Sequence, residues 1–292
     1  MNQKFYKYEA AGNDFVLIDN RQKLFNSKNP NLIRKICDRY SGVGSDGLIL
    51  LEKHKNLDFE MIYFNSDGSQ SGFCANGSRC ITHFANYLKI IKNKAKFEAS
   101  DGFHESVIDD LQIKVKMKDI KFSDIKSYND SKMTTFIDSG SPHIIFKTNN
   151  INNLDILSET SHNKEKFKQY SEGLNYNYWD IEKNKITLRT FERGVDCETK
   201  SCGSGSVALA ALLRFNSITE NENILISMPG GELQISLKKN DSSFYDIWLS
   251  GPVKQVFSGN FIITHLSFNN IFSRFRFKHF SFRKYIKVIN IY

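Results

Sequence analysis

The chain has 292 residues, of which 40% are hydrophobic and 25% are charged. This composition is typical of a soluble globular protein and is enough for one large domain or two of about 140 residues. The formal net charge of +8 would suggest a nucleic-acid-binding protein, but six Arg and Lys lie in residues 267–292, which contain no acid. The rest of the chain is nearly neutral. The positive charge therefore does not indicate that the main body of the protein binds nucleic acid, and it points to no particular function.

The cysteines and the apolar segments predict where the protein is found. Five cysteines without regular spacing indicate reduced thiols, and the spacings of Cys74 to Cys80 and of Cys197 to Cys202 do not match a zinc site. The first residues lack the apolar segment of a secretory signal, and no apolar run reaches the roughly 20 residues of a membrane-spanning helix. We therefore expect a cytoplasmic protein without a metal site.

The first half of the chain alternates short apolar runs with turns and two helical patterns. The helix after Cys74 has an apolar face with the spacing i, i+3, i+4, i+7, which predicts that it packs on a sheet. The predicted elements, in chain order, are a strand at 15–19, a helix at 31–40, strands at 48–51 and 59–64, the helix after Cys74, and strands at 97–99, 105–108 and 113–117.

The second half repeats this plan. Its helix from about Gly205 is apolar nearly all round, which predicts a fully buried helix inside a curled sheet. The predicted elements are strands at 134–138 and 144–147, a polar helix at 163–170, strands at 176–181 and 186–190, the helix from 205, strands at 224–228, 232–237 and 244–249, and an end of the body near 261–263.

Cys74 and Cys202 lie in similar surroundings in the two halves. The segments Gly72-Phe-Cys-Ala-Asn-Gly-Ser and Lys200-Ser-Cys-Gly-Ser-Gly-Ser each begin a predicted helix. The first N–H groups of a helix have no intrahelical partner, and the helix dipole there favours a thiolate. One such thiol indicates a nucleophile, whereas two indicate a pair of acid–base groups. Cys37 and Cys80, by contrast, lie on apolar helical faces and are interpreted as core residues.

Other polar residues near these motifs are candidate partners of the thiols. His143 and Glu192 lie in glycine-containing loops after predicted strands, where they could hold one sulfur ionised and the other protonated. Four asparagines also stand out, although an asparagine in a turn often serves its own backbone. They are Asn13, Asn65, Asn76 and Asn175.

These residues carry a resemblance to the diaminopimelate epimerase family. The two cysteine motifs together are highly specific for it, and the similar segments run in order from about Lys4 to Ile263. They are Ala11-Gly-Asn-Asp-Phe-Val, Asn65-Ser-Asp-Gly-Ser with Cys74-Ala-Asn-Gly-Ser-Arg-Cys80, Gly140-Ser-Pro-His143, and Phe191-Glu-Arg-Gly-Val with Glu198-Thr-Lys-Ser-Cys-Gly-Ser-Gly.

The resemblance implies a fold and an assembly. The fold is α+β, with two pseudo-symmetric domains, each a curved, mostly antiparallel sheet or barrel around a central helix, and the active site lies in the cleft between them. We expect the domains at residues 1–120 and 121–263, with some mixing of strands between the two, and a basic aromatic tail at 264–292 outside the similarity. The resemblance also implies a homodimer.

The implied activity is the cofactor-independent interconversion of LL- and meso-2,6-diaminopimelate, in lysine and peptidoglycan-precursor biosynthesis. Cys74 and Cys202 correspond to the two acid–base residues, and His143 and Glu192 to the residues that adjust them. No cofactor or metal is implied. The implied substrate contacts are the side chains of Asn13, Asn65, Asn175, Glu192 and Arg193 and the backbone at Ala75, Asn76, Gly203 and Ser204.

Four positions depart from the family pattern. Ala75 replaces the usual glycine after the first cysteine, which requires a negative φ there. Ser141 stands where many members have asparagine, which could weaken a contact to the distal end of the substrate. Ser204 replaces the commoner threonine, a mild change if its N–H binds the substrate. Cys197 is unusual, and on oxidation it could pair with Cys202.

Alternative functions remain open from the sequence. A proline racemase or hydroxyproline epimerase uses the same thiol pair, although Glu192 and Arg193 suit a diamino diacid better. A phenazine-biosynthesis-type isomerase shares the fold but lacks the two cysteines. A different class, an RNA- or membrane-binding protein, would depend on the tail alone, in which phenylalanines alternate with Arg and Lys. We favour a small-molecule enzyme that binds neither nucleic acid nor membrane.

Overall fold

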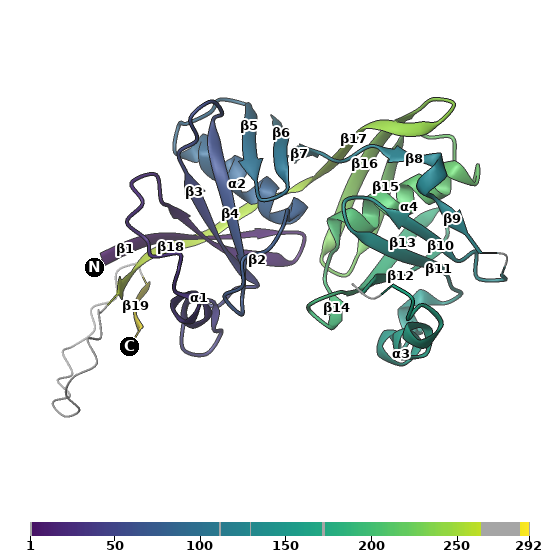
Figure 1. Ribbon diagram of the computed structural model, residues 1–292, viewed down its shortest axis with the longest axis horizontal. Coiled ribbons are helices and arrows are strands. Elements are labelled where there is room, and N and C mark those ends of the chain that lie inside the picture. Colours follow the sequence, from purple (N-terminus) through teal and green to yellow (C-terminus); the bar gives the residue numbers. More distant parts are fainter. Residues whose placement is uncertain (1, 111, 129, 171–172, 264–286, 292) are drawn as a thin grey trace.

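The computed structural model describes residues 2–110, 112–128, 130–170, 173–263 and 287–291. Two lobes lie side by side, and strands surround helix α2 in one lobe and helix α4 in the other (Figure 1). The described helices are α1 (Pro30–Cys37), α2 (Ala75–Tyr87), α3 (Ile156–Lys166) and α4 (Gly203–Phe215), with short 3-10 turns η1 (Phe122–Asp124) and η2 (Ile151–Asn153).

The strands are short and alternate along the chain with these helices. In the first lobe they are β1 (Asn2–Ala10), β2 (Asn13–Asp19), β3 (Gly47–Glu52), β4 (Phe59–Asn65), β5 (Lys94–Ala99), β6 (Gly102–Asp109) and β7 (Gln112–Lys116). The later strands are β8 (Ile120–Lys121), β9 (Lys126–Ser127), β10 (Thr135–Asp138), β11 (Pro142–Lys147), β12 (Asn175–Glu182), β13 (Lys185–Glu192), β14 (Cys197–Thr199), β15 (Asn223–Met228), β16 (Gly231–Lys239), β17 (Ser243–Pro252), β18 (Lys254–Ile263) and β19 (Lys287–Ile291).

The two lobes pair their strands in the same order. From β1 to β7, successive pairs are antiparallel, parallel, antiparallel, parallel, antiparallel and antiparallel. The strands β10, β11, β12, β13, β15, β16 and β17 pair successively in the same six orientations. Helices α2 and α4 both lie between the fourth and fifth strands of their series. The expected fold of two pseudo-symmetric halves is therefore confirmed.

Each lobe has a core built on its central helix. The residues from Val207 to Leu213 of α4 are 0% exposed and join one apolar cluster with strands β15, β16 and β17. This confirms the prediction of a helix enclosed on all sides, because a helix with no polar face must be covered all round. Helix α2 packs against strands β1 to β5 with the predicted apolar face. Ile81, Phe84 and Ala85 of this face are fully buried.

The lobes are joined by strands that pass from one to the other (Figure 1). β17 pairs with β16 of the second lobe and with β7 of the first. β18 then pairs with β1, so the strand that follows the second lobe in sequence lies in the first lobe. The domain division at residue 120 stays a prediction, and this return strand shows that a single cut in the sequence does not separate the two strand series.

The structure corrects several predicted boundaries. α3 covers 156–166 rather than 163–170, because Asp155 caps its start by accepting from the N–H of Ser158 at 3.1 Å. α1 ends at Cys37 rather than residue 40, and the strands β1, β8, β9, β14 and β18 were not predicted. In the tail, residues 264–286 and 292 lie outside the described residues, and β19 pairs in parallel with β18.

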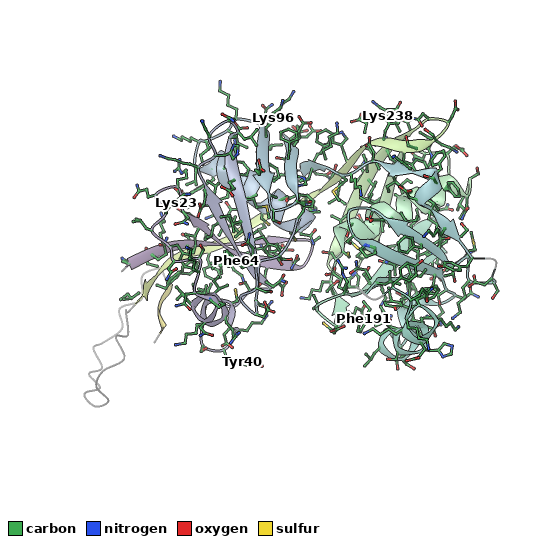
Figure 2. All side chains as sticks on the ribbon, viewed as in Figure 1. Lys23, Tyr40, Phe64, Lys96, Phe191 and Lys238 are labelled. Carbon is green, nitrogen blue, oxygen red and sulfur yellow. The ribbon has the colours of Figure 1, made fainter. Side chains whose placement is uncertain are left out.

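Many charged side chains lie on the outside of the two lobes, although Lys7, Glu52, Arg79 and Arg214 are buried. Figure 2 shows the labelled lysines Lys23, Lys96 and Lys238 at the periphery of the molecule, and each pairs with a carboxylate. Among the described residues, no helix is both long and apolar enough to cross a membrane. No group of three or more His, Cys, Asp or Glu in that part of the chain is arranged to hold a metal ion.

Candidate active site

Cys74 and Cys202 occupy equivalent positions at the starts of α2 and α4. Each is the residue that caps its helix, with φ and ψ of −122° and 111° at Cys74 and −121° and 110° at Cys202. Nearly identical backbone angles place both sulfurs next to the unpaired N–H groups of a first helical turn. The sequence prediction that each cysteine begins a helix is confirmed.

The two helix starts touch each other. A Cβ atom added to Gly203 would lie 2.9 Å from Cβ of Ala75, which is closer than two carbon atoms can pack. Nδ2 of Asn76 donates across the same contact to Oγ of Ser201 at 3.0 Å, and within its own lobe to Oδ1 of Asn13 at 3.3 Å. The residues directly after the two cysteines are therefore in contact, which brings the two motifs of the sequence into one site.

Cys74 is half-buried, and the first turn of its own helix supports its sulfur. The N–H of Gly77 donates to Sγ at 3.4 Å. Burial raises the pKa of the Cys74 thiol to about 11, while the N–H of Gly77 acts in the opposite direction. The negative charge of Glu192, from the other lobe, also raises this pKa. Glu192 therefore acts on the first cysteine as well as on the second.

Cys202 is buried and has side-chain partners that Cys74 lacks. Burial raises the pKa of its thiol well above the ordinary value, and the charge of Glu192 raises it further. The hydroxyl of Ser204 lies 3.6 Å from Sγ and lowers the pKa. The carboxyl of Glu192 interacts with this sulfur and accepts a hydrogen bond from Oγ1 of Thr199 at 2.9 Å. Burial raises the pKa of Glu192, so its carboxylate is a ready acceptor for the thiol proton.

His143 lies on β11 with its side chain fully enclosed. Its Nε2 is 2.9 Å from Oγ of Ser204 and 3.0 Å from Oγ of Ser141, and its Nδ1 is 2.9 Å from Nδ2 of Asn177. Burial lowers the pKa of His143 to about 3, so the ring is neutral at physiological pH. The hydroxyl of Ser204 therefore lies between the ring of His143 and the sulfur of Cys202.

The predicted asparagines differ in their surroundings. Nδ2 of Asn13 donates to Oδ2 of Asp46 at 2.6 Å, which leaves its Oδ1 toward Asn76. Asn175 accepts from the backbone N–H of Arg193 at 3.0 Å, next to Glu192. Asn65 ends β4 and donates to Ser69 of its own turn at 3.3 Å, as an asparagine in a turn commonly does. A role of Asn65 in substrate binding stays a prediction.

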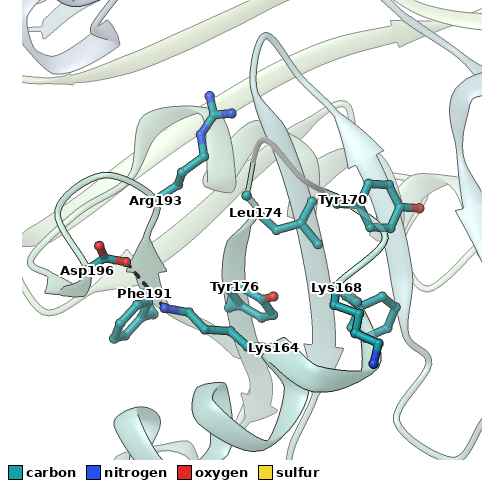
Figure 3. Close-up of a pocket in the computed structure, with 10 residues that line it drawn as sticks. Lys164, Lys168, Tyr170, Leu174, Tyr176, Phe191, Arg193 and Asp196 are labelled. Carbon is teal, nitrogen blue, oxygen red and sulfur yellow. Dashed lines mark hydrogen bonds and ion pairs between the residues drawn. The ribbon is translucent and has the colours of Figure 1, made fainter.

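Arg193 also lines a small cavity of about 190 Å³ between α3 and the end of β13 (Figure 3). The cavity is lined by aromatic and cationic side chains, and Lys164 pairs with Asp196 at 3.4 Å at its edge. In Figure 3 the guanidinium of Arg193 points away from Tyr176 and Phe191. The cavity therefore lies on the side of Arg193 that faces Tyr176 and Phe191. No residue of the contact between the two helix starts lines it.

The structure tests one departure from the family pattern, Ala75, and shows the surroundings of the others. Ala75 is the first helical residue of α2 and is not among the described residues with positive φ, so the condition on its backbone is met. The hydroxyl of Ser141 lies among Asn175, His143 and Ser204. All five cysteines lie in the described part of the chain and are free thiols, and Cys197 is exposed.

Three residues of the site were missed in the sequence. Ser201 bonds Asn76, Asp46 orients Asn13, and the buried Asn177 bonds His143. Ser201 lies in the segment of the second cysteine motif, and Asp46 lies in the glycine- and serine-rich loop before the strand at 48–51, so their position was a usable signal. Asn177 alternates with Asn175 along one strand, and an amide on the inner face of a buried strand is a polar group that needs partners.

Comparison with known proteins adds a family and a fold. The family model described as diaminopimelate epimerase matches residues 5–122 and 135–256. A diaminopimelate epimerase of Flavobacterium psychrophilum is 40% identical over 255 residues, covering 87% of this chain and 98% of that protein. One of Chlorobaculum tepidum is 36% identical over 260 residues, covering 86% and 98%.

Solved structures show the same architecture at low identity. A PhzF-family phenazine biosynthesis protein of Bacillus anthracis has a TM-score of 0.72 at 13% identity, covering 90% of this chain and 100% of that chain. A hydroxyproline epimerase of Agrobacterium vitis, solved with trans-4-hydroxy-L-proline, has a TM-score of 0.66 at 13% identity, covering 89% and 92%. At such identity these likenesses show the fold alone.

Proposed function

This chain belongs to the diaminopimelate epimerase family, and we propose that it interconverts LL- and meso-2,6-diaminopimelate with Cys74 and Cys202 as the two acid–base groups. The reaction would supply lysine and peptidoglycan-precursor biosynthesis in the cytoplasm. Inversion of an amino-acid α-carbon requires removal of a proton from one face and delivery of another to the opposite face. One thiolate and one thiol on opposite sides of the carbon meet this requirement.

The observation that carries the proposal is the matched pair of helix starts. Cys74 and Cys202 have the same backbone angles, and the residues after them, Ala75 and Gly203, are in contact. Two thiols held this way from opposing helices can address the two faces of one carbon. A single nucleophile would not need a second, equivalent thiol on a repeated scaffold.

The helix starts also supply backbone hydrogen-bond donors that can stabilise a carbanion. The α-proton of an amino acid is far less acidic than a thiol, so fixed donors must stabilise the charge that develops. The backbone N–H groups at Ala75–Asn76 and Gly203–Ser204 belong to first helical turns and suit the α-carboxylate. Because these donors are built into the fold, the proposal assigns no cofactor.

The remaining contacts are assigned by charge and by position. Arg193 is suited to the substrate carboxylate and Glu192 to its ammonium group. Asn175 holds the backbone between these two residues, and Asn13 and Asn65 are assigned to the distal amino-acid centre. We also infer that the protein works as a homodimer, as the resemblance to the family implies.

The experiment that tests the function is exchange of the α-proton of LL-diaminopimelate in deuterated water. The wild-type protein is expected to incorporate deuterium and to form the meso isomer. L-Proline and trans-4-hydroxy-L-proline, offered in parallel, are expected to remain unchanged, because they lack the second amino-acid centre. Turnover of a proline substrate without turnover of diaminopimelate would replace the proposal by the racemase alternative.

A further inference from the structure

Asn177 on β12 has an amide whose orientation is fixed by its neighbours. Its side chain is fully enclosed, and Nδ2 lies 3.2 Å from the carbonyl oxygen of Ile144 and 3.1 Å from that of Asn175. Carbonyl oxygens only accept hydrogen bonds, so the NH₂ group must face them. Oδ1 accepts from the hydroxyl of Thr190 at 3.0 Å. The amide therefore cannot be turned over without losing its two bonds to these carbonyl oxygens.

This orientation decides which nitrogen of His143 carries the hydrogen. Nδ2 of Asn177 is 2.9 Å from Nδ1 of the ring. Two donors facing each other would repel, so Nδ1 is the acceptor and the hydrogen of the neutral ring lies on Nε2. Nε2 faces the hydroxyls of Ser204 at 2.9 Å and Ser141 at 3.0 Å. The ring therefore donates toward these hydroxyls.

The direction of these hydrogen bonds continues through the two hydroxyls to the sulfur of Cys202. The amide of Asn175 donates to Oγ of Ser141 at 3.1 Å, and Ser141 lies 3.3 Å from Oγ of Ser204. With Asn175 and His143 as the outer donors, Ser204 accepts from both Ser141 and the ring. Its own hydrogen is left for Sγ of Cys202, at 3.6 Å.

We propose that Asn177 and Ser204 are positioning residues, of which Asn177 fixes the tautomer of His143 and Ser204 delivers the resulting donor to Cys202. The proposal rests on the proposed function, because it assumes that Cys202 is one of the two acid–base thiols. In this arrangement the ring does not remove the thiol proton. The series of donors instead ends at Ser204, whose hydroxyl donates to the sulfur and stabilises its thiolate.

The charged groups around the ring and the sulfur agree with this arrangement. Arg193, from the loop after β13, disfavours a protonated imidazole and adds to the effect of burial on the pKa of His143. Glu192, from the end of β13, raises the pKa of Cys202 and so favours the protonated thiol. Ser204 and Glu192 thus act on the same sulfur in opposite directions, which keeps both protonation states accessible.

Nitrogen-15 NMR of histidine-labelled protein tests the tautomer without any substrate. We expect wild-type His143, identified by the signal that His143→Gln removes, to be the neutral Nε2–H form from mildly acidic to mildly alkaline pH. Asn177→Asp exchanges the amide donor for a carboxylate acceptor and is expected to move the hydrogen to Nδ1. An Nδ1–H signal in the wild type would overturn the proposal, whether or not the Asp variant folds.

Ser204→Ala and the matched variant Ser204→Thr test the second step. Both keep the backbone N–H that is the proposed substrate contact, so KM is expected to stay near the wild-type value. Ser204→Ala is expected to lower kcat about tenfold or more, the usual effect of losing a hydrogen bond to a charged group. It should also move alkylation of Cys202 by iodoacetamide, followed by peptide mass spectrometry, to higher pH.

Ser204→Thr retains the hydroxyl and is expected to keep both properties of the wild type. Equal behaviour of the Ala and Thr variants, in kcat and in alkylation, would show that the hydroxyl has no part in the reaction. The NMR and alkylation measurements use no diaminopimelate. They remain informative if the proposed substrate is wrong, so the two failures can be told apart.

Discussion

The starts of α2 and α4 have the same backbone and different surroundings. Cys74 is half-buried, and Gly77 of its own helix donates to its sulfur. Cys202 is buried, with the hydroxyl of Ser204 beside its sulfur and the carboxyl of Glu192 raising its pKa. The repeated fold therefore supplies two equivalent positions, while side chains of the second lobe make the two thiols chemically different. This difference suits a reaction that needs one acid and one base at a time.

Removal of either thiol is the strongest way to test the pair. We expect Cys74→Ala and Cys202→Ala each to abolish conversion of both stereoisomers, with a loss on the order of a thousandfold, the range of general acid–base catalysis. Deuterium incorporation at the α-carbon of LL- and meso-diaminopimelate measures it. A single alanine variant with near-normal turnover in both directions would contradict the two-thiol assignment.

The contact between the helix starts can be broken and repaired. Gly203→Ala places a methyl group 2.9 Å from Cβ of Ala75, and the displacement of the two helices is expected to lower kcat/KM by up to about a hundredfold. Ala75→Gly removes the opposing methyl and should restore activity in the double variant. Steady-state kinetics of the two single variants and the double variant form the measurement. Absence of any rescue would show that the two starts do not share this contact.

Glu192 raises the pKa of both thiols, and its own charge gives a pH-dependent effect on stability. Glu192→Gln removes the acceptor beside Cys202 and is expected to lower kcat about a hundredfold. Burial raises the pKa of Glu192, so the folded protein binds this proton more tightly than the unfolded chain does. The free energy of unfolding therefore falls as pH rises from the ordinary glutamate range through the raised pKa.

Glu192→Gln removes this loss of stability. The variant should be at least as stable as the wild type at neutral pH, and the difference should vanish in acid. Thermal unfolding of both proteins across this pH range measures the effect. A variant less stable than the wild type at neutral pH would mean that the carboxylate contributes to folding instead.

Cys197 is expected to have the smallest effect. It is exposed on β14, so Cys197→Ser should change kcat/KM by less than about twofold, as is usual for surface positions.

Mild oxidants are expected to inactivate the wild type through a disulfide between Cys74 and Cys202, reversed by added thiol. The Cys197→Ser variant should be inactivated equally. Resistance of this variant would instead indicate a disulfide between Cys197 and Cys202.

Local pattern predicted most of the elements, and two of its failures have local causes. The apolar residues from Val207 to Leu213 were enough to predict a helix enclosed on all sides. The start of α3 was placed seven residues late because its sequence is polar and Asp155, which caps it, lies in an asparagine-rich stretch with many possible caps. Strand β14 escaped notice because three residues are too few to show a periodic pattern.

The sequence by itself determined the two helix starts and the thiols on them, because a cysteine followed by small residues exposes backbone N–H groups wherever the chain goes. Only the tertiary structure decided that Ala75 meets Gly203, that β18 returns to β1, and that Asn177 faces His143. These pairs are distant in sequence, and no local preference fixes their contact. They form when two repeated sheets close around their helices, and this closure gives one thiol the partners that the other lacks.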